Sequence, residues 1–179
     1  IKNIIQDSDM VFIAAGMGGG TGTGAAPLVA DIARQNGALT IAIVTMPFSF
    51  EGNHRNRVAE EGLLKLVDKV DTLIIIPNDR LLNLCDRNTG VEGAFKMADQ
   101  VLHYGVQAIA EVITVPGFIN LDFADVRSVM QDAGPAWMSV GKASGKNRAR
   151  DAAKEALSSP LLDISPKGAK RVLFNISGG

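Results

Sequence analysis

The most chemically informative segment is an unbroken run of glycine and threonine at residues 18–24, with the sequence GGGTGTG. Glycine allows positive φ and lets backbone N–H groups come close to an anion. The run lies between a strand-like apolar segment and a helical segment, and a helix N-terminus attracts negative charge. The pattern therefore predicts a phosphate-binding loop rather than a plain flexible turn. The residues assigned to it are Gly18, Gly19, Gly20, Thr21, Gly22, Thr23 and Gly24.

Two common phosphate loops differ from this run. A P-loop needs a lysine after its last glycine, but Gly24 is followed by two alanines. The dinucleotide pattern G-x-G-x-x-A is matched formally from Gly20 to Ala25. However, the next apolar strand ends in Thr45, Met46 and Pro47, with no carboxylate at its tip to hold a ribose. A Rossmann-type nucleotide-binding oxidoreductase therefore remains the alternative interpretation.

The elements that must position this loop alternate between strands and helices. Continuous runs rich in Val, Ile and Leu predict a parallel sheet covered by helices on both faces, in an α/β fold. Ligands of such sheets bind at the carboxyl ends of the strands. The expected strands are Asp9–Ala15, Leu39–Val44 and Thr72–Ile76, and the expected helices are Ala25–Asn36 and Arg55–Val67.

The second half of the chain has a different pattern. Glu92–Thr114 reads as one long helix, which at about 1.5 Å per residue would be roughly 33 Å long and would suit a spacer between two lobes. Beyond it we expect helices at Phe123–Asp132 and Lys146–Leu157, and strands at Ala136–Gly141 and Val172–Ile176.

Composition excludes several classes of protein. The chain has 179 residues, 46% of them apolar, which argues against intrinsic disorder. Its formal net charge of −1 argues against a dedicated nucleic-acid binder. No apolar run approaches the roughly 20 residues of a membrane span. The single cysteine, Cys85, and the two histidines, His54 and His103, have no partner at metal-ligand spacing, so we expect no protein-built metal site. Because the chain starts at Ile1, we expect it to be a piece of a longer protein.

Several motifs in order along the chain resemble the tubulin/FtsZ superfamily, and within it the FtsZ family of bacterial cell-division GTPases. They are the glycine run 18–24, PFSFEG at Pro47–Gly52, IPND at Ile76–Asp79, the long helix, and NLDFAD at Asn120–Asp125. The resemblance implies a partial Rossmann-like GTPase domain at 1–91, a central helix at 92–114, and a synergy loop with the start of an α+β C-terminal domain at 115–179. The family's first glycine-rich loop has no counterpart here.

The resemblance also implies which residues bind GTP or GDP. Besides the glycine run, they are Thr45, Pro47, Glu51, Arg55, Asn78, Phe95 and Asp99. Glu51 and Arg55 would reach the ribose end, and Asp99 would accept from the guanine N1–H and N2–H₂. From the residues alone, Glu51 and Arg55 read as solvated loop charges and Phe95 as a core residue, and Asn78 could simply hold a turn.

Asn120, Asp122 and Asp125 are the catalytic residues that the resemblance implies, acting with Mg²⁺ at the nucleotide. From the residues alone, Asp122 reads most simply as a helix N-cap. Arg127 lies close enough in sequence to pair with either carboxylate.

The function implied by the resemblance is a cytoplasmic GTPase that polymerises head-to-tail at the division site, with hydrolysis completed by the acidic loop of the next subunit. Its partners would be further copies of itself and, through segments absent here, other cell-division proteins, without nucleic acid or membrane insertion. We expect the isolated fragment to be inactive. A scaffold that binds nucleotide without hydrolysing it is a third possibility.

Overall fold

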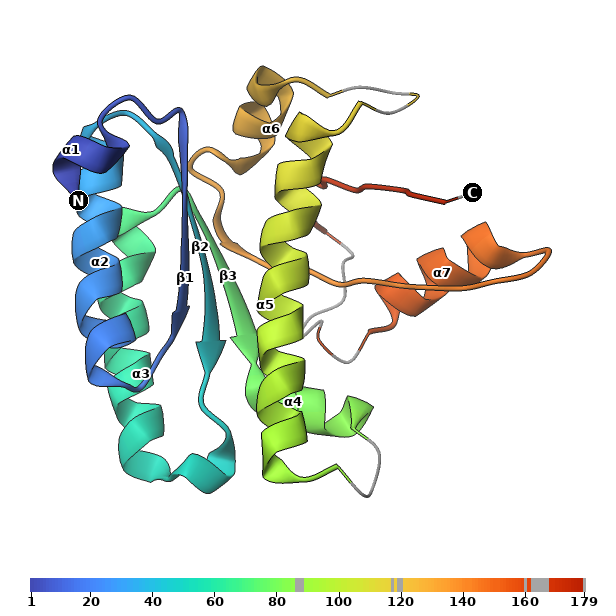
Figure 1. The fold of residues 1–179 in the computed structure, drawn as a ribbon, viewed down its shortest axis with the longest axis horizontal. Helices are drawn as coiled ribbons and strands as arrows, with labels where there is room; N and C mark the ends of the chain where they lie inside the picture. The colour runs from blue at the N-terminus through green and yellow to red at the C-terminus, as the bar shows by residue number, and fades with distance from the viewer. Residues whose placement is uncertain (86–88, 117, 119–120, 160, 162–167, 179) are drawn as a thin grey trace.

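The computed structural model describes residues 1–179 apart from 86–88, 117, 119–120, 160, 162–167 and 179. Four parallel strands form one sheet, with helices on both of its faces (Figure 1). The strands are β1 (Met10–Gly16), β2 (Leu39–Met46), β3 (Thr72–Pro77) and β4 (Gly134–Ala136). The α-helices are α1 (Lys2–Ile5), α2 (Gly20–Gln35), α3 (Asn53–Leu66), α4 (Asn78–Leu81), α5 (Val91–Thr114), α6 (Phe123–Met130) and α7 (Arg148–Leu157). The 3₁₀ turns are η1 (Ser49–Glu51), η2 (Val67–Lys69) and η3 (Leu82–Leu84).

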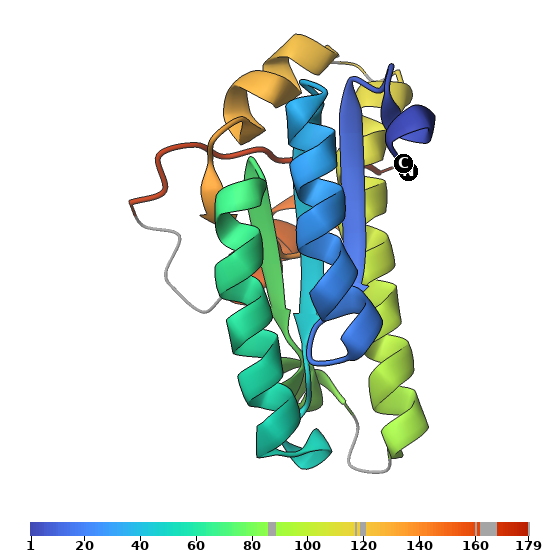
Figure 2. The same cartoon turned by 90° about the vertical axis from the view of Figure 1, so that its left-hand side faces the viewer.

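The sheet has the strand order β1-β2-β3-β4, which confirms the predicted α/β architecture. Helices α2 and α3 cover one face, and the long helix α5 covers the other (Figures 1 and 2). Seven of the eight residues of β2 are buried, as expected for a central strand with both faces covered.

Alternate residues of β2 enter two separate cores. Ala42 and Val44 pack under α2 and α3, in a cluster that includes Ala30 and Ala59. Ile41 and Ile43 face the other side, in a cluster with residues of β3, α5 and α6. Each fully buried Ile stabilises the fold by roughly 1.5–3 kcal/mol, so the two-sided burial of β2 fixes the sheet between its helical layers.

Two helices start earlier in the structure than the sequence predicted. Helix α2 begins at Gly20 rather than Ala25, so the last five residues of the glycine run, 20–24, are helical. The low helix propensity of glycine predicted a loop, but the packing of the first turn against the end of β1 overrides it. Helix α5 begins one residue early, at Val91, within the usual uncertainty of helix ends.

The later elements also differ from expectation. The fourth strand is Gly134–Ala136 rather than Ala136–Gly141, and it joins the main sheet beside β3, with Thr72 paired to Gly134. Residues Val172–Ile176 form no strand in the described structure, because a strand needs a neighbour for its backbone groups. Helix α6 ends at Met130, before Asp132, whose φ of +48° cannot continue a helix. Helix α7 begins two residues late, at Arg148.

Candidate nucleotide site and acidic helix

Three loops emerge together where the strands end, at the lower end of Figure 1. The register pairs Gly16 with Thr45 across β1 and β2, and Met46 with Pro77 across β2 and β3. The β1–α2 loop, the segment after β2 and the start of α4 are therefore neighbours. This is the edge at which the sequence places its phosphate loop, and parallel α/β sheets bind ligands there.

The glycine loop is folded tightly against the tip of β2. Gly18 has a φ of +94°, and its N–H donates to Thr23 Oγ1 over 2.8 Å. The Met17 N–H donates to the Thr45 carbonyl over 2.9 Å, which ties the loop to the neighbouring strand. A Cβ at Gly18 would lie 2.8 Å from both Cγ and the carbonyl oxygen of Arg55 and 3.4 Å from Pro47 Cγ. Thr45, at the end of β2, and Pro47, just after it, therefore lie against the glycine loop.

The N-terminus of helix α2 opens onto the glycine loop. Its N-cap is Gly19, which has an extended backbone and makes no side-chain cap hydrogen bond. The first N–H groups of a helix have no partner within it, so those that follow Gly19 are available to a phosphate. A Cβ at Gly20 or Gly24 would meet no atom within 4 Å, and Thr21 is exposed. The loop therefore has open space beside its helical amides.

Gly22 has a different reason for being glycine. A Cβ there would lie 2.3 Å from the Gly16 carbonyl oxygen. This close approach of the first turn of α2 to the end of β1 explains why the helix starts inside the glycine run. Gly22 thus serves the packing of the loop, whereas Gly20 leaves room for a ligand.

Glu51 and Arg55 form an ion pair, and Glu51 also accepts a backbone hydrogen bond. Glu51 Oε1 accepts the Phe48 N–H over 2.8 Å, and its Oε2 lies 3.1 Å from Arg55 Nη1. The Glu51 side chain is only 10% exposed, whereas that of Arg55 is 51% exposed beside the glycine loop. The solvated-loop alternative is therefore wrong for Glu51, while the Arg55 guanidinium stays accessible to a ligand.

Asp79 is a site residue that sequence reasoning missed. Its Oδ1 accepts the Ser49 N–H over 2.8 Å, and its Oδ2 accepts from the Ser49 hydroxyl. These bonds join the start of α4 to the segment after β2. The only signal in the sequence was its place in the Ile76–Asp79 motif, and a contact across 30 residues cannot be read from that.

Asn78, next to Asp79, is 4% exposed, and its side-chain oxygen has no hydrogen-bond partner. Buried polar atoms are nearly always paired, so an orphan at a loop edge suits a group that donates from a ligand. The observation favours a ligand contact over a simple turn residue.

Phe95 and Asp99 lie on successive turns of α5. Phe95 packs edge-on against Phe48 and Phe50, with ring centroids 5.3 and 6.2 Å away. It is nevertheless 39% exposed, so it belongs to a small aromatic cluster and still offers a free surface. Asp99 is exposed one turn further along the same helix. Both residues are placed where a base could lie beside α5.

The acidic pair lies at the opposite end of the molecule, where α6 covers the start of the strands (Figure 1). Asp122 is the N-cap of α6, and its Oδ1 accepts the Asp125 N–H over 2.8 Å. Asp125 Oδ2 accepts the Asp122 N–H over 3.2 Å in return, so the two form a capping box. Both residues are exposed. Asn120, the third proposed catalytic residue, lies outside the described residues.

The expectation that Arg127 pairs with this acidic pair was wrong. Its guanidinium donates to the carbonyls of Gly37 and Asp9, over 3.0 and 3.5 Å, and lies over the ring of Phe123. A helical residue two positions after Asp125 faces another side of α6, toward the sheet. The carboxylates are consequently left free of a cation in the part of the chain that the structure describes.

Two family models match the chain. The tubulin/FtsZ family GTPase domain matches residues 1–86, and the FtsZ family C-terminal domain matches residues 134–179. A solved structure described as an empty FtsZ dimer from M. jannaschii is 51% identical with a TM-score of 0.87, covering 90% of this chain and 47% of that one. The chain belongs to the tubulin/FtsZ family.

Other solved structures share the fold. CetZ1 from Haloferax volcanii, a GDP-bound monomer, is 22% identical with a TM-score of 0.64 and coverage of 86% of this chain and 45% of that one. A point mutant of the M. jannaschii FtsZ gives the same 51% identity and TM-score of 0.87, with 90% and 48% coverage. The chain thus spans about half the length of these solved relatives. The comparisons give no support to the oxidoreductase alternative.

The family's guanine-nucleotide chemistry fits the residues present, because the loop has open space at Gly20 and Gly24 and the oxygen of Asn78 is unpaired.

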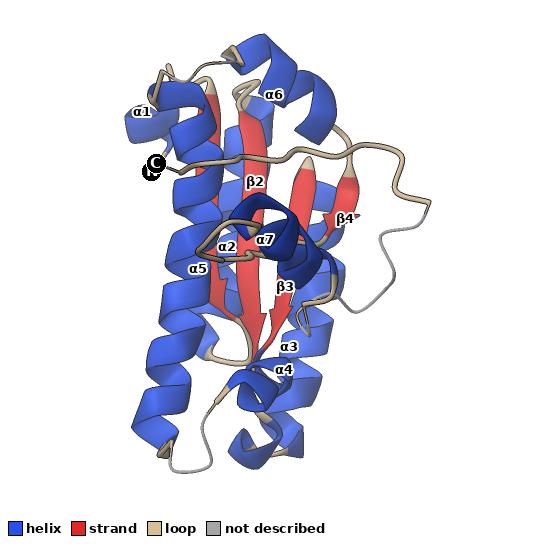
Figure 3. Cartoon of the chain, turned by 90° about the vertical axis from the view of Figure 1, so that its right-hand side faces the viewer, coloured by secondary structure: helices blue, strands red, loops and turns tan. Residues whose placement is uncertain are grey.

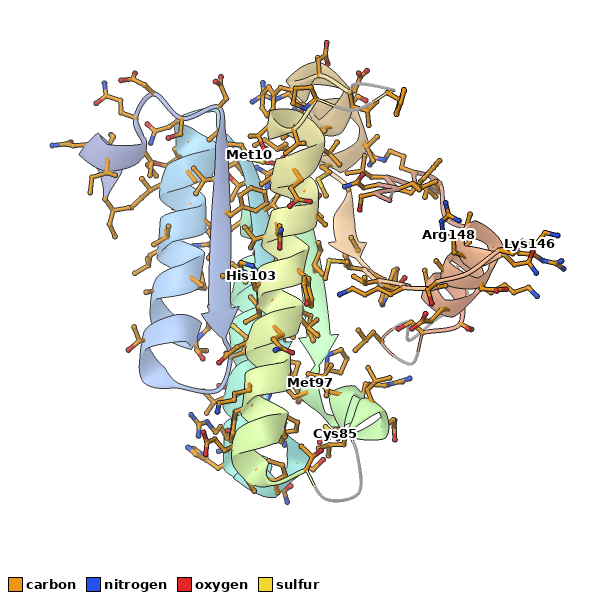
Figure 4. All side chains as sticks on the ribbon, turned by 45° about the vertical axis from the view of Figure 1, so that its right-hand side comes forward. Met10, Cys85, Met97, His103, Lys146 and Arg148 are labelled. Atoms are coloured by element: carbon orange, nitrogen blue, oxygen red, sulfur yellow. The ribbon has the colours of Figure 1, made fainter. Side chains whose placement is uncertain are left out.

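Among the residues that the structure describes, no group of three or more His, Cys, Asp or Glu side chains could hold a metal ion. Cys85 lies beside Met97, with sulfur atoms 3.7 Å apart, and His103 lies midway along α5 (Figure 4). None of the helices described is both long and apolar enough to cross a membrane.

Proposed function

We propose that this chain is the part of an FtsZ-type GTPase that holds the phosphates and base of GTP and supplies the acidic residues for hydrolysis. The observation that carries the proposal is the N-terminus of α2, whose open glycines leave backbone N–H groups available at the same edge of the sheet as the unpaired oxygen of Asn78. The amides would bind phosphate oxygens. Asp99 would accept the two N–H donors of guanine, and Phe95 would lie against the base.

Mg²⁺ bound with the nucleotide would offset the phosphate charge, and it would be held mainly through phosphate oxygens, as is usual for this ion. Arg55, which remains half exposed beside the glycine loop, would reach the ribose end of the nucleotide. Glu51 would act indirectly, because its carboxylate is already used by the Phe48 N–H and Arg55. The chain's own residues would therefore bind and orient GTP.

The separation between the proposed nucleotide site and the acidic pair implies that a neighbouring subunit completes hydrolysis. Helix α5 has 24 residues, which at 1.5 Å per residue span about 36 Å. A carboxylate must come within hydrogen-bond reach of the attacking water, directly or through one more water. Asp122 and Asp125 would therefore act on GTP bound to the next copy, and such a head-to-tail contact repeats into a filament. We propose that this filament is the one that forms the cytoplasmic cell-division ring.

GTP turnover per subunit, measured against protein concentration in the full-length natural chain, tests the proposal. Turnover should rise steeply above the concentration at which filaments form. Asp125→Asn should abolish it while preserving GTP binding and the capping box, because the amide oxygen can still accept the Asp122 N–H. Asp151→Asn, in the first turn of α7, is a matched control that should behave like the wild type.

A non-hydrolysing scaffold is the second candidate, and the capping box favours it because each carboxylate already accepts a backbone N–H from the other residue. Mixing two variant subunits distinguishes a GTPase from a scaffold that does not hydrolyse GTP. A Gly20→Val subunit that cannot bind GTP should restore turnover to Asp125→Asn subunits, by presenting its intact acidic pair to their nucleotide. Turnover that is absent in the wild type, or flat across the assembly threshold, would exclude hydrolysis in trans.

A further inference from the structure

Helix α6, which carries the acidic pair, is also held at its other end by a residue distant in sequence. The guanidinium of Arg171 donates to three carbonyls there, those of Ser128, Gln131 and Asp132, over 3.2, 3.0 and 3.3 Å. The last carbonyls of a helix have no partner within it, and a cation near them also favours the helix dipole. The segment that bears Arg171 crosses next to α6 (Figures 2 and 3).

The sheet holds α6 through other contacts. Arg127 reaches the carbonyls of Asp9 and Gly37, which precede β1 and β2. The Thr72 hydroxyl, at the start of β3, donates to the Met130 carbonyl over 2.5 Å. Arg34 of α2 pairs with Asp132 over 2.8 Å. These residues tie α6 to the first matched domain, whereas Arg171 belongs to the segment that matches the C-terminal domain model.

A small rotation of α6 would displace the acidic pair appreciably. The helix has eight residues and is therefore about 12 Å long. Asp122 and Asp125 lie at its N-terminal end and the Arg171 contacts at its C-terminal end. A tilt of about 5° about the C-terminal end would move the carboxylates by about 1 Å, and misplacing a catalytic group by that much can cost about 100-fold in rate.

We propose that Arg171 is a positioning residue for the acidic pair: its contacts with Ser128 of α6 and with the two residues that follow Met130 set the direction in which Asp122 and Asp125 point. The inference rests on the proposed function, because the carboxylates must have a reaction to serve. It also gives the C-terminal segment a direct influence on hydrolysis, since any movement of that segment reaches α6 through one guanidinium. Arg171 is itself exposed, so its replacement removes these contacts without opening the core.

The test compares Arg171→Gln with Arg171→Lys and with Lys170→Gln in the full-length natural chain. Lys170 is the exposed neighbour, and it is a matched control for loss of one positive charge. In assembled protein, Arg171→Gln should lower kcat roughly 10-fold, part of the roughly 100-fold that a 1 Å misplacement can cost. Its GTP affinity and assembly threshold should stay at the wild-type values. Arg171→Lys should recover part of the rate, because an ammonium keeps the charge but not the planar fork.

Mixing adds a readout that general destabilisation would not give. Arg171→Gln subunits have an intact nucleotide site, so Gly20→Val subunits should restore their turnover by supplying a well-placed acidic pair. Hydrogen exchange of the α6 amides should be faster in Arg171→Gln than in Lys170→Gln, whether or not the protein hydrolyses GTP. Equal kcat in these two variants, or a loss of kcat matched by a loss of GTP affinity, would overturn the positioning role.

The same measurements separate failure of this inference from failure of the proposed function. If the wild type itself shows no assembly-dependent turnover, the proposed function fails and the positioning role falls with it. If the wild type hydrolyses GTP, Asp125→Asn abolishes the activity and Arg171→Gln leaves kcat unchanged, only the role of Arg171 is wrong.

Discussion

Gly22→Ala adds a single methyl group at the tightest point of the glycine loop. The new Cβ would lie 2.3 Å from the Gly16 carbonyl oxygen, about 1 Å short of ordinary contact. The obstacle is the backbone at the end of β1, which cannot rotate away as a side chain could. Either α2 or the end of β1 must move, and the loop geometry that presents the helix N-terminus would change with it.

Two opposing effects set how much Gly22→Ala changes the free energy of unfolding. Alanine is favoured over glycine within a helix by about 1 kcal/mol. Overpacking of a tight contact costs roughly 1–3 kcal/mol. Gly24→Ala, two residues further along α2, has the first effect without the second, because a Cβ there meets no atom within 4 Å. We therefore expect Gly22→Ala to be less stable than Gly24→Ala by roughly 1–3 kcal/mol, the size of the overpacking cost.

The assay is urea denaturation of both variants and the wild type, without nucleotide, followed by circular dichroism. The slopes of the transitions should agree, so that the shift in midpoint reports the change in the free energy of unfolding. A GTP titration of each folded variant then measures the effect on the loop. Equal stability of Gly22→Ala and Gly24→Ala would refute the close approach of α2 to β1, and with it the reason given for the start of α2 at Gly20.

Two further substitutions separate packing from ligand contact. Gly20→Val should leave the free energy of unfolding nearly unchanged, because its Cβ meets no protein atom within 4 Å, but it should abolish GTP binding in a titration; wild-type affinity would place the phosphates elsewhere. Asp99→Asn should reduce the preference for GTP over ATP by roughly 1.5–3 kcal/mol, the value of hydrogen bonds to a charged group. Competition binding of the two nucleotides measures this preference, and an unchanged ratio would remove Asp99 from the base site.

Local patterns in the sequence were sufficient to predict much of the fold. The apolar runs at β1, β2 and β3 were found within two residues. For β2 and β3 the reason is that a strand buried on both faces needs apolar residues throughout, whereas β1 is apolar although only Ile13 is fully buried. The placement of the glycine run at the carboxyl edge of the sheet followed from the alternation of strands and helices. The roles of Asp99, Asp122 and Asp125 came from resemblance alone, and they stay predictions.

Contacts between distant segments were beyond the reach of such patterns. Asp79 was only the last residue of the Ile76–Asp79 motif until the fold placed it against Ser49. Arg127 lay close enough in sequence to pair with the acidic pair, but the fold turned it toward Gly37. Glu51 likewise looked solvated, although the loop folds it inward to accept the Phe48 N–H. In each case the side chain's partner lies on a loop or element whose position depends on the packing of the sheet.

The amino-acid sequence by itself determined a parallel α/β sheet with a glycine-rich run at its carboxyl edge, because strand burial, helix periodicity and glycine backbone freedom act over a few neighbouring residues. Only the tertiary structure decided that α2 starts at Gly20, that Gly134–Ala136 joins the main sheet, and that Arg171 meets the last turn of α6. Each of these depends on which backbone groups are brought within about 3 Å of one another, the range of a hydrogen bond. Such proximity is a property of the packed chain rather than of any short segment.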